Sequence, residues 1–297
     1  RAALARPALQ TAFVGFEVRR VSDGQVLATH EAGRGFTPAS TMKLLTTAAA
    51  LDALGPDERV RTTLESAALV EKGRLRGDLY LVGRGDANLS GRFSDGRVTA
   101  AFEALADGLA AAGVSVVEGR LVGHEGAFAG DRRGRDWSWD DLVWWYGAEV
   151  SALSFNDNCV DLKVAPGDAP GRPAQVTPTP LSSYYRLEST AVTGAPGSED
   201  TLELKREPGG NLVRLSGSLA VGAEPRTLNV ALEDPARWAA TVFSEVLRSK
   251  GIVVLGGLET SSAPLPPGAR VLATHEGRPL REELAAVNKT SQNLHAE

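Results

Sequence analysis

The sequence contains one cysteine, Cys159, so no disulfide can form within the chain. Its four histidines are scattered without the spacing of a metal site, and we expect neither a metal nor a cofactor. Basic residues are not in excess, because 32 lysines and arginines stand against 37 acidic residues, and this balance argues against a nucleic-acid partner. Long apolar runs are also missing, so we expect no transmembrane segment.

What remains is the composition of a globular protein. With 297 residues and 42% hydrophobic content, the chain can bury a full core and is long enough for two or three domains. It is neither disordered nor fibrous. A net charge of -5 favours peptides or small molecules as partners. The residues from Arg1 to Leu4 do not begin a signal peptide, which is typical of a mature or trimmed chain.

The first part of the sequence predicts an α/β arrangement. It alternates strand patterns with good helix formers, and a strand, helix, strand order is typical of an α/β sandwich. The expected elements are a hairpin at 12–19 and 25–29, a helix at 41–54, strands at 61–70 and 78–82, a helix at 98–112 and a strand at 119–123.

The second part begins with a change of composition. From 166 to 226, proline, glycine, serine and threonine with short alternating runs predict a small all-β insert. Asp234 and Pro235 then begin a strong helix that ends at Gly251. A strand at 252–255 comes next, so we expect the chain to return there to the α/β unit.

The segment from Pro38 to Lys43 places a hydroxyl and an amine one turn apart at the start of the expected helix 41–54. Residues three apart share a helix face, so the Lys43 amine can reach the Ser40 oxygen. The free N–H groups of the helix end favour an oxyanion, and together with burial they disfavour a protonated amine. The pattern predicts an acyl-transfer nucleophile, Ser40, with Lys43 as its general base.

The bare Ser-x-x-Lys pattern carries little weight. With 20 serines and 6 lysines in the chain, chance alone gives roughly 0.4 matches. The context adds weight because Ser40 opens the helix, and Leu44, Leu45 and Leu51 predict burial on several of its faces. The alternative, an ordinary N-cap serine beside a surface lysine, remains open at this point.

A serine acyl enzyme of this type also needs a proton relay to the leaving amine and an amide that holds the substrate. A Ser-x-Asn triplet supplies both, and two occur, at 154–156 and 291–293. The first leads into a strand pattern, where its polar side chains are typical turn formers. The second leads into residues 294–297, which look like the opening turn of a helix. We favour Ser291 and Asn293.

Four further blocks come after the 40–43 motif in order, at 81–89, 137–141, 146–158 and 288–297. With these blocks the sequence resembles the low-molecular-mass class C penicillin-binding proteins, which are D-alanyl-D-alanine carboxypeptidases and endopeptidases of the serine peptidase type. The resemblance covers essentially the whole chain. It implies an α/β (α+β) fold with a penicillin-recognising, serine-transferase-like domain.

The resemblance also implies a nested domain order. The catalytic, transpeptidase-like domain would comprise 1–62 and 280–297 and be incomplete. An α/β domain at 63–165 and 227–279 would be inserted between its first two motifs. The small β-rich domain at 166–226 would in turn be nested within that insertion.

Roles for particular residues are implied by the resemblance as well. Ser40 would attack the D-Ala-D-Ala carbonyl of a peptidoglycan stem peptide, and Lys43 would take its proton. Ser291 would pass a proton to the departing D-alanine, and Asn293 would bind the substrate amide. A β-lactam would stall at the resulting ester and so act as an inhibitor. The resemblance further implies an extracytoplasmic location, in the periplasm or cell envelope.

Asp141 and Tyr146 are candidates for substrate binding. The resemblance implies that an acid and an aromatic residue at these positions face the cleft. There they would form a pocket for the free amino end of a stem peptide. A carboxylate suits an ammonium group, and an aromatic face suits its aliphatic stem. The alternative is an aromatic packing patch in which Asp140 or Asp141 caps a helix.

The Lys-Thr-Gly element of penicillin-recognising enzymes does not occur in these 297 residues. The run Lys289-Thr290-Ser291 lacks the glycine and overlaps the second motif. We therefore expect a truncated sequence, with a Lys-Thr-Gly beyond Glu297. Two other functions remain open: a non-catalytic module that binds cell-wall peptide, and a β-lactamase.

Overall fold

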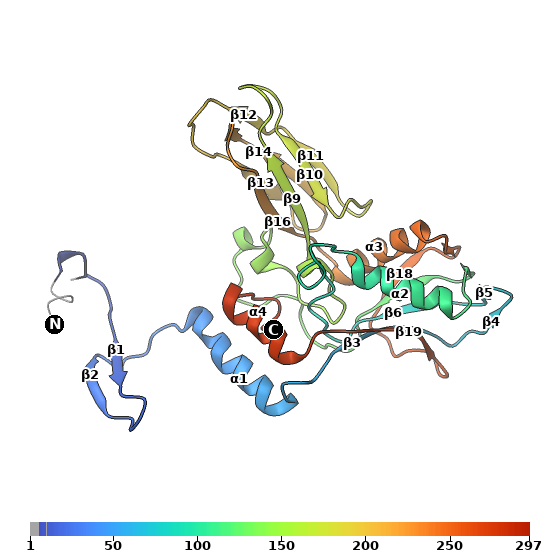
Figure 1. The fold of residues 1–297 in the computed structure, drawn as a ribbon, viewed down its shortest axis with the longest axis horizontal. Coiled ribbons are helices and arrows are strands. Elements are labelled where there is room, and N and C mark those ends of the chain that lie inside the picture. The colour runs from blue at the N-terminus through green and yellow to red at the C-terminus, as the bar shows by residue number, and fades with distance from the viewer. Residues whose placement is uncertain (1–5, 10) are drawn as a thin grey trace. The chain divides into compact units, whose positions relative to one another are not determined.

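A computed structural model describes residues 6–9 and 11–297 (Figure 1). The chain forms two compact units, one up to Met42 and one from Lys43, and each is described by itself. The first contains a 3-10 turn, η1 (Pro7–Leu9), the strands β1 (Phe16–Arg19) and β2 (Val26–His30), and a second turn, η2 (Ala39–Thr41). β1 and β2 pair antiparallel, which confirms the expected hairpin.

The second unit is built on a five-stranded sheet of order β18-β8-β6-β3-β19. The pairs β18–β8 and β8–β6 are parallel, and the other two are antiparallel. The bounds are β3 (Arg61–Ser66), β6 (Leu79–Val82), β8 (Leu121–His124), β18 (Leu258–Ser261) and β19 (Arg270–Glu276). A smaller sheet joins β17 (Val253–Val254), β7 (Val116–Val117), β5 (Arg74–Leu75) and β4 (Val70–Glu71).

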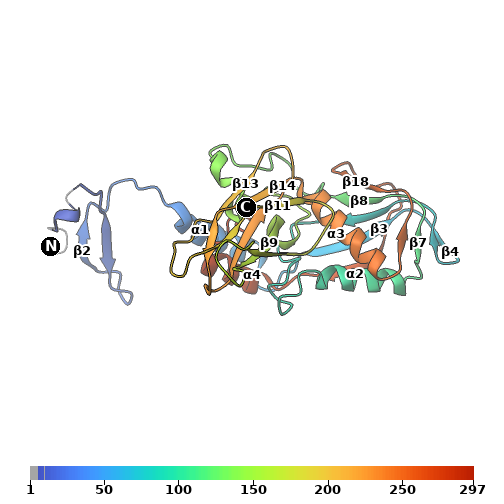
Figure 2. The same cartoon turned by 90° about the horizontal axis from the view of Figure 1, so that it is seen from above.

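Two helices, α2 (Ala100–Ala111) and α3 (Pro235–Ser249), cover one face of the five-stranded sheet (Figures 1 and 2). α3 begins as expected, since the Asp234 carboxylate accepts a hydrogen bond from the Arg237 backbone N–H at 3.3 Å. It lies so close to β8 that a Cβ at Gly123 would come within 2.6 Å of the Ala236 carbonyl oxygen. The sheet residue is therefore a glycine because the helix backbone occupies the space.

Between 166 and 226 the structure has strands and no helix, which confirms the all-β insert. The strands form three sheets, β10-β9-β16, β11-β14-β13 and β12-β15. Their bounds are β9 (Cys159–Ala165), β10 (Gln175–Thr179), β11 (Arg186–Ser189), β12 (Val192–Gly194), β13 (Glu203–Arg206), β14 (Leu212–Ser216), β15 (Ser218–Ala220) and β16 (Arg226–Ala231). The first sheet crosses the expected domain boundaries at 165 and 227, which remain a proposal.

Three expectations differ from the structure. The strand expected at 61–70 stops at Ser66, because its hydroxyl donates to the Asp78 carbonyl at 2.7 Å and accepts from the Ala68 N–H at 3.1 Å. The helix α4 (Leu280–Thr290) was not expected, although Leu280, Leu284 and Val287 have helical spacing. The helix expected to open at 294–297 is not formed, because residues 294–296 make a turn instead.

The expected burial of the helix at 41–54 is wrong. α1 (Met42–Leu54) has the expected bounds, but Leu44 and Leu45 are 61% and 67% exposed. Thr47 is its only buried residue and accepts a hydrogen bond from the Asn288 side chain on α4 at 3.1 Å. α1 thus meets α4 through one narrow polar face, and its leucines lie outside that contact.

Candidate active site

Lys43, in the first turn of α1, faces the residues that come after α4. Its Nζ donates to the Asn293 Oδ1 at 2.6 Å and to the Ser291 Oγ at 3.3 Å. These residues lie about 250 positions from Lys43 along the chain, so the fold brings the two expected motifs together. The lysine side chain is half-buried. The amine is therefore held in one place by two acceptors.

Ser291 ends α4 in the left-handed conformation, with φ 58° and ψ 40°. This conformation turns the chain out of the helix, as an αL C-cap does. The Asn293 amide Nδ2 then donates to the Tyr146 carbonyl at 2.9 Å, while its Oδ1 accepts from Lys43. With both ends of the amide engaged, Asn293 links α1, α4 and the loop that carries Tyr146.

A half-buried carboxylate, that of Asp157, holds the same turn from the other side. Asp157 accepts hydrogen bonds from the Gln292 Nε2 at 3.0 Å and the Arg92 Nη2 at 2.6 Å, and its Oδ1 lies 2.8 Å from the His295 Nε2. Burial alone would raise the pKa of Asp157, but the hydrogen bonds and charges of His295 and Arg92 outweigh it and lower the pKa. An ionised Asp157 thus holds both Gln292 and His295.

Ser40 belongs to the first unit and is described within it. It lies in η2 (Ala39–Thr41), directly before α1, so it stands next to the helix start as expected. Ala39 has a positive φ of 44°, which non-glycine residues adopt at a cost of about 1–3 kcal/mol. The turn is closed by the Thr41 N–H and hydroxyl, which both donate to the Pro38 carbonyl, at 3.0 and 2.5 Å. The backbone just before the expected nucleophile is therefore strained.

Asp141 and Tyr146 lie in two short turns of one loop, η3 (Trp139–Asp141) and η4 (Trp145–Gly147). Burial raises the pKa of the Tyr146 phenol, and so do the charge of Asp141 and the hydrogen bond between the two side chains. The Tyr146 ring packs edge-on against Trp145, with ring centroids 5.7 Å apart. The Asp141 carboxylate and the Tyr146 phenol form a pair. The backbone carbonyl of Tyr146 connects this pair to Asn293, whose amide donates to it.

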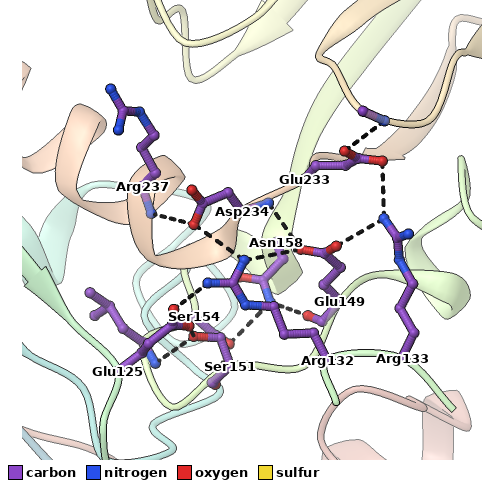
Figure 3. Close-up of polar contacts among 12 residues, drawn as sticks. Glu125, Arg132, Arg133, Glu149, Ser151, Ser154, Asn158, Glu233, Asp234 and Arg237 are labelled. Atoms are coloured by element: carbon purple, nitrogen blue, oxygen red, sulfur yellow. Dashed lines mark hydrogen bonds and ion pairs between the residues drawn. The ribbon is translucent and has the colours of Figure 1, made fainter. Parts of the chain in front are cut away.

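Ion pairs hold together the two ends of this loop, near Arg132 and Val150, as Figure 3 shows. The Val150 N–H donates to the Arg132 carbonyl at 2.8 Å. Arg133 pairs with Glu149 at 2.8 Å, and Arg132 pairs with Asp234, the N-cap residue of α3, at 3.3 Å. The loop carrying Asp141 and Tyr146 is thereby fastened to a core helix.

The first Ser-x-Asn triplet has a different environment. Ser154 and Asn156 are buried, and their side chains donate to the backbone carbonyls of Ser151 and Cys159 at 3.0 and 3.2 Å. Asn156 has a positive φ of 49°, as do its two successors at 53° and 57°. These are turn-forming contacts, which agrees with the preference for Ser291 and Asn293.

The sequence patterns did not single out Asp157 or Arg92, and they gave His295 no role in the site. The signal was weak, since Asp157 lies between the two asparagines of a turn and the chain distance to His295 is 138 residues. Within residues 6–9 and 11–297, no group of three or more histidine, cysteine, aspartate or glutamate side chains could hold a metal ion. Of the helices in the described ranges, none is both long and apolar enough to cross a bilayer.

A mixed α/β fold in which a helix-borne lysine meets a Ser-x-Asn turn is the arrangement expected of a penicillin-recognising serine peptidase, and the family comparison agrees. The chain belongs to the D-Ala-D-Ala carboxypeptidase 3 (S13) family, whose model matches residues 1–297. The resemblance seen in the sequence is thus confirmed.

Two curated relatives are similar to the chain. The D-alanyl-D-alanine carboxypeptidase of Actinomadura sp. (strain R39) is 38% identical over 306 residues, which cover 100% of this chain and 55% of the relative. The D-alanyl-D-alanine carboxypeptidase DacB of Haemophilus influenzae is 26% identical over 286 residues, covering 94% and 56%. The chain therefore spans little more than half the length of these relatives.

Two solved structures share the fold. Penicillin binding protein 4 (dacB) from Haemophilus influenzae superposes with a TM-score of 0.77 at 23% identity, covering 95% of this chain and 60% of the other. The same protein in complex with a novel β-lactam gives a TM-score of 0.68 at 23% identity, covering 94% and 58%. At this identity the likeness establishes the fold alone.

Proposed function

We propose that the protein is a serine-type D-Ala-D-Ala carboxypeptidase that acts on peptidoglycan stem peptides through an acyl-enzyme. The observation that carries the proposal is the pair of contacts from the Lys43 amine to the Asn293 amide oxygen and the Ser291 hydroxyl, at 2.6 and 3.3 Å. Family membership supplies the reaction class, and the relatives named as D-alanyl-D-alanine carboxypeptidases support it.

The proposed reaction has two steps. The Ser40 oxygen attacks the carbonyl of the penultimate D-alanine while its proton passes to the Lys43 amine, and the Ser40 N–H stabilises the oxyanion. The C–N bond then breaks, and the Ser291 hydroxyl gives a proton to the departing amine. Lys43 passes its proton to the Ser291 oxygen in turn. Water hydrolyses the ester in the second step. Asn293 orients the substrate amide through the side chain that also holds Lys43.

Asp141 and Tyr146 would contribute substrate binding. Their paired carboxylate and phenol offer a negative charge beside an aromatic ring, which suits the free ammonium group of a stem peptide on its aliphatic stem. The Tyr146 carbonyl bonded to Asn293 sets the distance of this pair from the reacting centre. Action on peptide cross-links, as an endopeptidase, would use the same pair.

The proposal also covers location and inhibition. A substrate in peptidoglycan requires an extracytoplasmic site of action, in the periplasm or cell envelope. A β-lactam would acylate Ser40 as the peptide does, and a structure of similar fold is known with a β-lactam bound.

The test is covalent labelling of the protein, extended by any residues encoded after Glu297 in its reading frame. After incubation with benzylpenicillin, intact mass and peptide mapping should show one adduct, on Ser40. Ser40→Ala should abolish the adduct, whereas Ser22→Ala, an exposed serine of the hairpin turn, should keep it. A folded protein that gains no adduct, or gains one elsewhere, contradicts the proposal.

A further inference from the structure

A cavity of about 460 Å³ lies beside the Ser-x-Asn turn, on another side from Lys43. Thr290 and Gln292, which flank Ser291, line this cavity, while Ser291, Asn293 and Lys43 do not. The volume falls within the range of small-molecule sites. The cavity is therefore next to the candidate active site but separate from it.

One carboxylate in this cavity, that of Asp161, takes part in no ion pair among the described residues. Arg92 and Asp157 both line it, but they pair with each other at 2.6 Å. Asp161 has only amide partners: its Oδ1 accepts from the Asn229 Nδ2 at 2.5 Å and its Oδ2 from the Asn156 Nδ2 at 3.2 Å. Among the residues that the structure describes, no lysine, arginine or histidine forms an ion pair with Asp161.

The position of Asp161 explains how it reaches the cavity. It lies on β9, directly opposite Asn229 on β16, so the two side chains share one face of the sheet. Val160, Leu162 and Val164 point to the other face and are fully buried in the core. Burial raises the pKa of Asp161, and this effect outweighs the amide hydrogen bonds and the charge of Arg92, which lower it.

The rest of the lining is suited to an organic group. Trp145 packs against the buried cluster of Ala148, Cys159 and Ala231, and Val98 adds a further apolar wall. An aromatic face attracts cations, and apolar walls accept a hydrocarbon stem. The charged side chains of the lining are Arg92, Asp157 and Asp161, so the cavity has one carboxylate more than it has cations, beside apolar walls.

We propose that this cavity binds the primary ammonium group of a small organic cation with a short hydrocarbon stem, such as the side chain of a diamino acid. The ammonium group would donate to the Asp161 carboxylate, and the stem would lie against Trp145. The site is distinct from Asp141 and Tyr146. It does not require the peptidase activity proposed above, because it stands on the cavity and its charge alone.

The experiment titrates the protein with 1,5-diaminopentane, using uncharged 1,5-pentanediol as the matched probe. Two-dimensional NMR follows the Trp145 indole N–H and the side-chain amides of Asn156 and Asn229. The diamine should give saturable shifts at these groups, and the diol should not. Asp161→Asn keeps the side-chain volume and should raise the half-saturating concentration about tenfold or more. Asp168→Asn, at an exposed carboxylate outside both sites, should leave it unchanged.

A second variant keeps the proposal testable if Asp161→Asn fails to fold. Val98→Phe fills part of the cavity without changing its charge and should also weaken binding. The proposal is overturned if the diamine gives no saturable shift, if the diol gives the same shift, or if Asp141→Asn rather than Asp161→Asn removes it. Equal shifts with magnesium chloride at equal or lower concentration would also overturn it, because the cavity would then hold an inorganic cation.

Discussion

Asn293 is the single residue that joins the most parts of the candidate site. Its amide accepts from the Lys43 amine at 2.6 Å and donates to the Tyr146 carbonyl at 2.9 Å. The Lys43 amine becomes charged as it takes the Ser40 proton, and a hydrogen bond to a charged amine contributes about 1.5–3 kcal/mol. We therefore expect Asn293→Ala to lower the second-order rate constant of β-lactam acylation by about 10- to 100-fold. Stopped-flow kinetics with a fluorescent penicillin would measure it.

A stability control separates this effect from unfolding. The thermal midpoint of each variant is measured beside its acylation rate, and rates are compared only at temperatures where the variant is fully folded. Asn293→Asp should impair acylation more than alanine does, because a carboxylate beside Lys43 favours the protonated amine, which is no base. Acylation within twofold of the unmodified protein in both variants would be inconsistent with the role assigned to Asn293.

Glu283 is a residue whose charge should make stability depend on pH. It lies in the first turn of α4, is 8% exposed, and has a pKa raised to about 7 by burial and by the charge of Asp86. The other groups facing it are Asn88, Arg92 and the backbone at Arg278. Burial raises the pKa of Asp86 as well, and His275 lies 3.7 Å from that carboxylate.

The raised value determines the sign of the effect. Between about pH 4.5 and pH 7, Glu283 keeps its proton in the native state and has lost it in the unfolded state. Its contribution to the unfolding free energy is therefore complete below about pH 4.5 and disappears as pH rises through about 7. Glu283→Gln keeps the shape and cannot ionise. We expect it to reduce the loss of unfolding free energy between pH 5 and pH 8 by on the order of 2 kcal/mol. Urea titrations at several pH values measure this.

The matched control is the neighbouring Glu282→Gln, whose side chain is exposed and pairs with Arg278. Surface pairs of this kind contribute about 0–1 kcal/mol, so the pH profile should keep its slope. If Glu282→Gln flattened the profile and Glu283→Gln did not, the buried carboxyl would not be the group that titrates.

The element that presents Ser291 is α4 together with the turn after it. Asp157 holds this turn by accepting from Gln292 and pairing with Arg92 and His295. Asp157→Asn removes the negative charge and leaves Arg92 without its partner. We expect a loss of roughly 1–3 kcal/mol in unfolding free energy, because the pair is only partly buried and hydrogen bonds to a charged group contribute about that much.

The same substitution should also slow acylation. Freed from Asp157, the turn would hold Ser291 and Asn293 less firmly beside Lys43, so the acylation rate should fall about tenfold under conditions in which the variant is fully folded. The comparison is Asp95→Asn, an exposed loop residue, which should change neither quantity. A variant as stable and as reactive as the parent would show that the turn keeps its shape unaided.

At the level of elements, sequence patterns predicted the features that local signals determine. Asp234 and Pro235 predicted the start of α3, and the run of helix formers predicted the bounds of α1. The burial of α1 could not be predicted in this way, because exposure depends on which surfaces meet. The turn at Ser291 is likewise set by distant contacts, since Asp157 and Arg92 reach it from other parts of the chain.

The same division holds for the candidate site. The choice of Ser291 and Asn293 over Ser154 and Asn156 rests on local patterns, because the first triplet leads into a strand pattern and the second does not. Their catalytic roles stay predictions. The contacts of Asp157 could not be predicted. Its partners Gln292 and His295 lie 135 and 138 positions away along the chain, and contacts at such separations leave no local sequence pattern. The roles of Asp141 and Tyr146 came from family resemblance and stay predictions.

Within the second unit as a whole, an aromatic cluster joins the elements of the core. Trp238 on α3 is fully buried and contacts Phe155, Tyr184 and Tyr185, with ring centroids 5.6, 5.6 and 6.1 Å away. Phe155 stacks in turn on Phe102 of α2 at 4.6 Å. Tyr184 and Tyr185 belong to the β-rich insert. The cluster therefore connects this insert with the two helices that cover the five-stranded sheet.

This connection predicts that the insert and the helices unfold together. Trp238→Ala should lower the unfolding free energy by about 3–5 kcal/mol, through lost burial and the cavity left behind. Hydrogen exchange measured by mass spectrometry should show equal loss of protection in α2, α3 and the strands β11 and β14. Trp139→Ala, at a tryptophan that is 74% exposed, should change protection in none of them. Loss confined to α3 would mean that the insert is stable without the cluster, and the two parts would then be separate folding units.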